Sequence, residues 1–101
     1  MFRIVPRLYV ITHVDVMPPH AEAAELLLRN RVATVAATPG VESIDALQQV
    51  HRKNHFELMT VYASEEAYDQ VVSTPEAREF HNQLDPMLGA PMDDRIHYLL
   101  G

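Results

Sequence analysis

The six histidines are the side chains of this sequence best suited to proton transfer, because a neutral imidazole accepts a proton near neutral pH. His81 is the most interesting of them. It follows Phe80, which belongs to the apolar stripe of a predicted helix, so the imidazole lies at the edge of that stripe and can point inward. His81 is our candidate general base. The alternative is a histidine that fills the edge of the stripe and hydrogen-bonds locally.

Metal binding is the second chemistry that histidines suggest. His51 and His55 flank a predicted hairpin turn and could face each other. However, the sequence has no HxxxH pair on a predicted helix and no cysteine, so the usual zinc ligand sets are missing. We predict no metal site and assign most of these histidines to the surface.

Composition and charge argue against several other functions. The formal net charge of −6 over 101 residues disfavours nucleic acid and membrane as partners, since both select basic patches. The absence of cysteine removes disulfides and thiolate nucleophiles, and it fits a reducing, cytoplasmic location. The N-terminal stretch MFRIVPRLYVITHV contains Arg3, Pro6 and Arg7, and it predicts an irregular lead-in to a strand and not a signal peptide. A phosphate-binding glycine loop and a Ser–His–Asp signature are also missing.

Hydrophobic periodicity predicts the element order β-α-β-β-α-β. The expected strands are residues 8–16, 41–51, 55–63 and 95–100, and the expected helices begin near residues 19, 64 and 75. The second helical region is broken because Thr74-Pro75 is a new helix start, a capping residue followed by proline. This order is the ferredoxin-like α+β plan, with one antiparallel sheet and helices on one of its faces. We expect a single domain over residues 1–101.

The helix expected over residues 19–38 has an apolar stripe and a charged face. The stripe contains Ala24, Leu28, Val32 and Val35 at helical spacing. The remaining positions include four charged residues, which predict a solvated face: Glu22, Glu25, Arg29 and Arg31.

The strand HFELMTVYA is apolar on both of its faces. One parity carries Phe56, Leu58 and Tyr62, and the other carries Met59 and Val61. A strand with one wet face should alternate apolar and polar residues, so both faces are expected to be covered. Because no spare element is available, a second copy of the chain is the simplest cover, and we predict a homodimer through the open sheet face. The alternative is a monomer with an apolar open face.

The stretch NHFELMTVYASEEAYDQVVSTPEAREFHNQL, followed by RIHYLL, resembles the antibiotic-biosynthesis-monooxygenase superfamily. The resemblance runs from Tyr9 to Leu100, and it is more specific for fold than for reaction. It implies a dimeric α/β barrel. Members of the superfamily include cofactor-independent quinol and polyketide monooxygenases and haem-degrading enzymes.

The resemblance also implies a cavity between the sheet and the helices, one in each subunit. It implies that the alternate side chains of Phe56, Leu58, Thr60 and Tyr62 face that cavity. Met59 and Val61, on the other face of the strand, then face the partner subunit. If Thr12 faces the cavity, then His13 faces the dimer barrel, where we expect it to pair with Asp15 or with a partner residue.

Haem degradation fits this resemblance poorly. Haem-degrading members have a ligand histidine at the position of His81, a tryptophan at that of Val71 and an asparagine at that of Thr12. Only the histidine is present here.

The quinol-monooxygenase pattern is kept in part. Members of that type often carry histidines at the positions of Val71 and Glu76, and both are missing. Tyr68 and the opening Asn54-His55-Phe56 of the strand are kept. Tyr62 stands where many members have an aromatic residue, which would suit a flat aromatic substrate. The alternative for Tyr62 is core filling, with its hydroxyl bonded to a nearby acceptor.

These observations lead to one hypothesis and two alternatives. The chain is expected to be a cofactor-independent monooxygenase that oxidises a small aromatic or quinol-like molecule with O2. The predicted catalytic residues are His81 and Tyr62, and the predicted substrate-binding residues are Thr12, Asn54, Phe56, Leu58, Tyr68 and Phe80. A protein that binds or isomerises a small molecule without oxygenation is the first alternative, and a haem-handling protein is the second.

Overall fold

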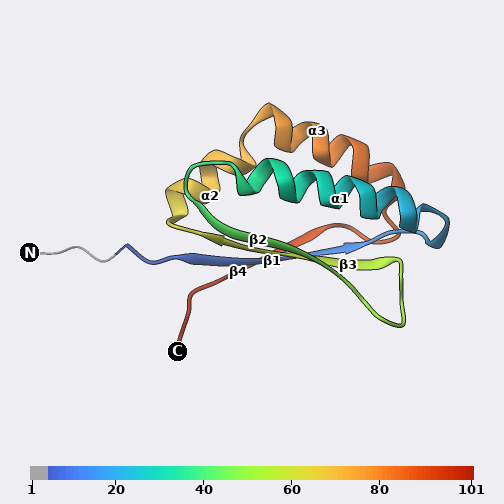
Figure 1. The fold of residues 1–101 in the computed structure, drawn as a ribbon, viewed down its shortest axis with the longest axis horizontal. Helices are drawn as coiled ribbons and strands as arrows, with labels where there is room; N and C mark the ends of the chain where they lie inside the picture. Colours follow the sequence, from blue (N-terminus) through green and yellow to red (C-terminus); the bar gives the residue numbers. More distant parts are fainter. Residues whose placement is uncertain (1–4) are drawn as a thin grey trace, which may run out of the picture.

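Four antiparallel strands form one sheet, and the helices cover one face of it (Figure 1). The computed structural model describes residues 5–101, so Arg3 of the predicted N-terminal lead-in lies outside the described residues. The strands are β1 (Leu8–Asp15), β2 (Val41–Gln48), β3 (His55–Tyr62) and β4 (Asp93–His97), in the order β2-β3-β1-β4. The helices are α1 (Ala21–Ala36), α2 (Glu65–Val72) and α3 (Pro75–Leu84), and the 3-10 turns are η1 (Pro18–His20) and η2 (Asp85–Met87). This is the ferredoxin-like α+β fold that the sequence predicts.

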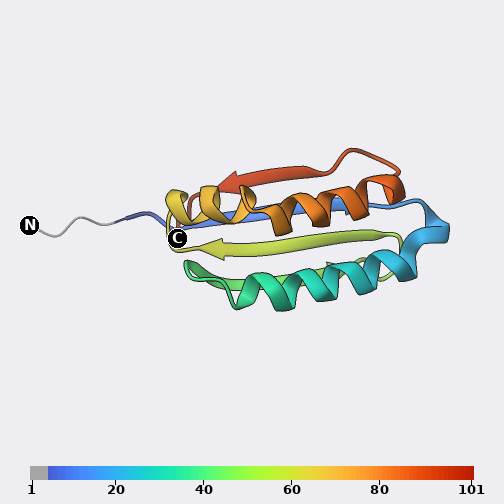
Figure 2. The ribbon, with the colours of Figure 1, turned by 90° about the horizontal axis from the view of Figure 1, so that it is seen from above.

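Helix boundaries follow the capping signals of the sequence. The Ser64 hydroxyl accepts a hydrogen bond from the Ala67 N–H at 3.1 Å and begins α2. The Thr74 hydroxyl does the same for the Ala77 N–H at 3.1 Å, and Pro75 occupies the first turn of α3. The predicted break in the second helical region is therefore confirmed. Seen from above, α1 runs along β2, and α2 and α3 follow one another in a second line (Figure 2).

The last strand differs from the prediction of residues 95–100. Its pairing with β1 runs from His13↔Asp93 to Tyr9↔His97, and the chain then leaves the sheet. Residues 98–100 turn toward the side opposite the helices, where Leu100 is fully exposed (Figure 1). Their apolar character suggested a strand, but the pairing with β1 ends at His97, and the composition of these residues does not show where that pairing ends.

The core is divided into two clusters beneath the helices. One cluster includes Phe56, Phe80 and Leu84, and the other includes Val10, Val35 and Tyr62, with further residues in each. On β3 the parity Phe56, Leu58, Thr60, Tyr62 is buried under the helices, whereas Met59 is 42% exposed on the other face. The predicted division of β3 into a face covered by the helices and an open face is correct. Within residues 5–101, no helix is both long enough and apolar enough to cross a lipid bilayer.

Candidate active site

A small cavity lies between the sheet and the helices, next to the boundary between the two core clusters. Its volume is about 40 Å³. Its floor comes from β1, β2 and β3, and its roof from α1, α2 and α3. Its rim comes from Asp94 on the edge strand β4 and from Met92 just before that strand. Six polar side chains line it: Thr12, Arg31, Thr60, Tyr62, His81 and Asp94.

Asp94 organises the hydrogen bonds at the rim. Thr12 and Asp94 are directly opposite each other in the β1–β4 pair, so both side chains project toward the helices. The Thr12 hydroxyl donates to Asp94 Oδ1 at 2.6 Å, and the Tyr68 hydroxyl lies 3.4 Å from Oδ2. Thr12 and Tyr68, both predicted site residues, are thus joined through one carboxylate. Asp94 was not predicted, because its position depends on the β1–β4 register.

Tyr62 and Tyr68 are kept as neutral phenols. Their rings meet edge to face with centroids 5.3 Å apart. Burial raises the pKa of Tyr62 to about 12, while the positive charge of Arg31 acts in the opposite direction. Burial and then Asp94 raise the pKa of Tyr68. Near neutral pH each hydroxyl is therefore a hydrogen-bond donor and not a base.

The raised pKa of Tyr62 predicts a loss of stability at alkaline pH. The folded protein holds the phenolic proton up to a pKa of about 12, whereas the unfolded chain releases it near pH 10. The stabilisation is complete below pH 10 and disappears as pH rises to 12, a change of about 2 kcal/mol. Urea unfolding across this range should show a steeper decline for the wild type than for Tyr62→Phe. Parallel pH profiles for the two proteins would contradict this assignment.

Arg31 faces the cavity and not the solvated side of α1. Its guanidinium carbon lies 5.2 Å from the centre of the Phe80 ring, a cation–π distance. Burial lowers the pKa of Arg31, and nearby Tyr62 and Glu76 oppose that change. The prediction of a solvated face is correct for Arg29, which pairs with Glu25 at 3.3 Å, and wrong for Arg31. The sequence spacing could have predicted this orientation, because Arg31 stands three residues after Leu28 and four before Val35, on the apolar stripe of the helix.

His81 lies at the rim of the cavity. Its imidazole meets the Phe80 ring edge to face, with centroids 5.9 Å apart, and the residue is exposed to solvent. It lines the same cavity as Tyr62. The structure therefore places both predicted catalytic residues around one space.

The remaining predicted site residues divide into two groups. Leu58 and Phe80 line the cavity. Phe56 instead packs in the neighbouring core cluster. The Asn54 side-chain amide donates to the Val16 carbonyl at 2.8 Å, which ties the start of β3 to the end of β1. Asn54 and Phe56 are thus separated from the cavity.

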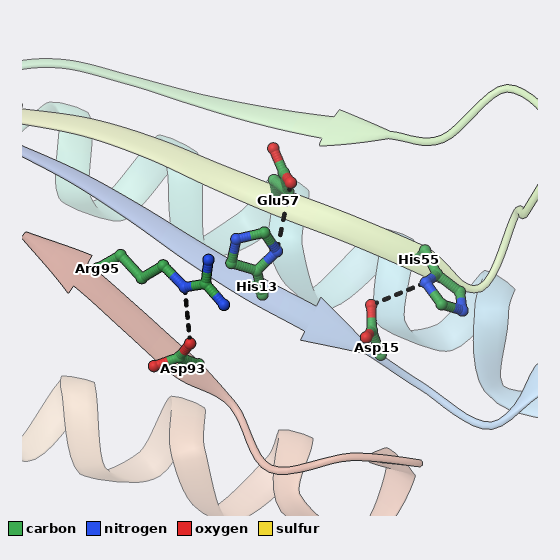
Figure 3. Close-up of polar contacts among 6 residues, drawn as sticks. All are labelled: His13, Asp15, His55, Glu57, Asp93 and Arg95. Carbon is green, nitrogen blue, oxygen red and sulfur yellow. Dashed lines mark hydrogen bonds and ion pairs between the residues drawn. The ribbon is translucent and has the colours of Figure 1, made fainter.

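The open face of the sheet carries a row of contacts between basic side chains and carboxylates (Figure 3). His13 Nδ1 lies 3.3 Å from Glu57 Oε1, and His55 Nδ1 lies 3.0 Å from Asp15 Oδ1. Of the two expected partners of His13, Asp15 is wrong, because the β1–β3 register puts Glu57 directly opposite His13. In the same register His55 lies opposite Asp15 and contacts it. The hairpin had suggested that His55 faces His51. Among the described residues, no three His, Asp or Glu side chains are grouped as metal ligands.

Comparison with known proteins agrees with this fold. The solved structure of a Pseudomonas aeruginosa protein has a TM-score of 0.89 at 24% identity and covers 99% of this chain and 100% of its own. A Nitrosomonas europaea protein, provisionally described as an antibiotic biosynthesis monooxygenase, has a TM-score of 0.89 at 17% identity, with 99% and 96% of the two chains covered.

A Lactobacillus acidophilus protein, provisionally described as a monooxygenase, is 25% identical with a TM-score of 0.82. The alignment covers 93% of this chain and 44% of that longer one. None of the curated proteins matches the chain. The family model for antibiotic biosynthesis monooxygenases matches residues 7–83, which is most of the sequence. This chain belongs to the antibiotic biosynthesis monooxygenase family.

Proposed function

We propose that the chain is a cofactor-independent monooxygenase that oxidises a small aromatic or quinol-like molecule with O2. The observation that carries the proposal is the cavity in which His81, Tyr62 and the Thr12–Asp94 pair surround one space. Family membership and the monooxygenase descriptions of two structural relatives support it.

The proposed reaction needs a base and hydrogen-bond donors. His81 at the rim removes the phenolic or enolic proton of the substrate. The resulting anion gives one electron to O2, and the radical pair recombines to form a carbon–oxygen bond. The peroxide takes up the proton that His81 removed, and loss of water then leaves the oxidised carbon as a carbonyl. One oxygen atom is retained, and the other leaves as water with that proton and the single hydrogen of the attacked carbon. The Tyr62 hydroxyl, held as a neutral donor, stabilises the developing peroxide charge.

The volume of the cavity limits this reaction. About 40 Å³ accommodates water molecules, whereas sites for drug-sized ligands span about 300–1,000 Å³. Phe56, Phe80 and Leu84 fill the neighbouring part of the core, which counts against a large substrate bound in the present conformation. In addition, Val71 and Glu76 stand at positions where histidines are common in the family. The filled core and these two replacements favour a second candidate function, a protein that binds or isomerises a small metabolite. A haem group is far larger than this space.

Oxygen uptake with a series of dihydroxynaphthalenes tests the proposal. We expect uptake by the wild type and a rate at least about 100-fold lower for His81→Ala, because general-base removal usually costs this much. His51→Ala, in an exposed histidine of the β2–β3 connection, is the matched control and should retain full activity. An inactive wild type, or equal rates for both variants, would reject the oxygenase mechanism. Ligand-dependent melting without oxygen uptake would support the second candidate.

We also propose that two copies pair through the open sheet faces. Tyr9, Ile11, Met59 and Val61 form the apolar centre of that face. The exposed residues Tyr98, Leu99 and Leu100 border a hollow of about 240 Å³ over the same strands. A contiguous apolar surface of this kind is uncommon on soluble monomers. His13 and His55 lie beside it, where their imidazoles contact the Glu57 and Asp15 carboxylates and give these groups polar neighbours when pairing removes water.

A further inference from the structure

Arg31 is a half-buried cation whose charge has no ion-pair partner among the described residues. In the part of the chain that the structure describes, five ion pairs are present and Arg31 is in none of them. The influence of Glu76 on it acts at longer range. A partly desolvated guanidinium without a carboxylate is costly, so a ligand that supplies an anion would be favoured.

Arg31 and Phe80 separate the cavity from a second space. A groove of about 240 Å³ runs between α1 and α3 on the outer side of the helices, and both side chains line it as well as the inner cavity. The wall between the two spaces therefore includes these two side chains. Phe80 supplies an aromatic surface, and the guanidinium lies over that surface.

The charges around the two spaces limit which anion fits. Glu76 and Glu79 line the outer groove, and Asp94 lies at the rim of the inner cavity. A multiply charged group such as a phosphate monoester would be repelled by these carboxylates. A singly charged, planar carboxylate matches the fork of one arginine, and a ring attached to it would pack against Phe80.

We propose that Arg31 binds the carboxylate of an aromatic acid, with the aromatic ring against Phe80 and access through the groove between α1 and α3. The inference deepens the proposed function by naming the substrate class, a hydroxyaryl carboxylate, and rests on that function only for the oxygenation step. Displacement of the Phe80 ring joins the two spaces and provides the volume that the inner cavity lacks.

The test is calorimetric binding of 1-hydroxy-2-naphthoate and of 1-hydroxy-2-naphthamide under nitrogen. The two probes share ring and hydroxyl and differ only in the anionic group. We expect the wild type to bind the acid at least 10-fold more tightly than the amide. Arg31→Gln should remove this preference, Arg31→Lys should retain part of it, and Arg29→Gln, an exposed arginine of the same helix, should leave it unchanged.

This binding assay tests the proposed carboxylate site independently of the proposed oxygenase reaction. Failure of the wild type to bind the acid, equal affinity for acid and amide, or an unchanged preference in Arg31→Gln would overturn it. Because no oxygen is present, the outcome does not depend on turnover. A protein that prefers the acid in this assay and consumes no oxygen in air would retain the binding site and reject the proposed reaction.

Discussion

Replacing Met59 with lysine is expected to prevent the proposed pairing of two copies through the open sheet face and to leave the fold intact. Met59 lies at the centre of the open sheet face, opposite Ile11 on β1 and Asp45 on β2. In a monomer the new ammonium group is in water and beside the Asp45 carboxylate, so it is tolerated. In the proposed dimer the new ammonium group and the Asp45 carboxylate beside it would both lose their water, at a cost of several kcal/mol. We expect the dissociation constant to rise by at least about 100-fold.

Sedimentation at several protein concentrations measures this change. Leu26→Lys is the matched control, because Leu26 is an exposed apolar residue on α1, in the helix layer and away from the open face. It should leave the dimer unaffected. A wild type that sediments as a monomer throughout, or a Met59→Lys protein that remains dimeric, would show that the open face is not the interface.

Local signals in the sequence were sufficient to predict the order of the elements. The caps at Ser64 and Thr74 act on amides three residues away, so their effect can be inferred without the rest of the fold. The two faces of β3 follow from its period of two residues, and the burial of Phe56 and the exposure of Met59 confirm that inference.

The features that were missed depend on strand register and on helix rotation. The end of β4 is determined by its pairing with β1, and the partner of His13 by the alignment of β1 with β3. Asp94 reaches Thr12 for the same reason. Arg31 is charged and was assigned to the solvent, yet its place on the apolar stripe of α1 turns it toward the cavity. Side-chain type alone could not show this, because a long arginine can extend from a buried face toward polar groups.

Gly40→Ala is expected to lower the free energy of unfolding by about 3 kcal/mol. Gly40 connects α1 to β2 with a φ of 88°, a backbone conformation that costs about 1–2 kcal/mol for a residue with a Cβ. The added Cβ would also lie 2.7 Å from the Ala67 Cβ on α2, an overlap that forces the helix to move. Overpacking of this kind typically costs another 1–3 kcal/mol. Because α1 carries Arg31 and α2 carries Tyr68, the displacement would also alter the candidate site.

Urea unfolding of matched variants at one protein concentration separates the two contributions. Gly89→Ala is the control, since its Cβ would meet its nearest atoms at 3.7 Å and its φ is not in the left-handed region, so a change below about 1 kcal/mol is expected. Adding Ala67→Gly to Gly40→Ala removes the collision but not the backbone strain. The double variant should therefore be more stable than the sum of the two single changes predicts. Equal stabilities of Gly40→Ala and Gly89→Ala would mean that neither the backbone conformation nor the contact with α2 restricts this position to glycine.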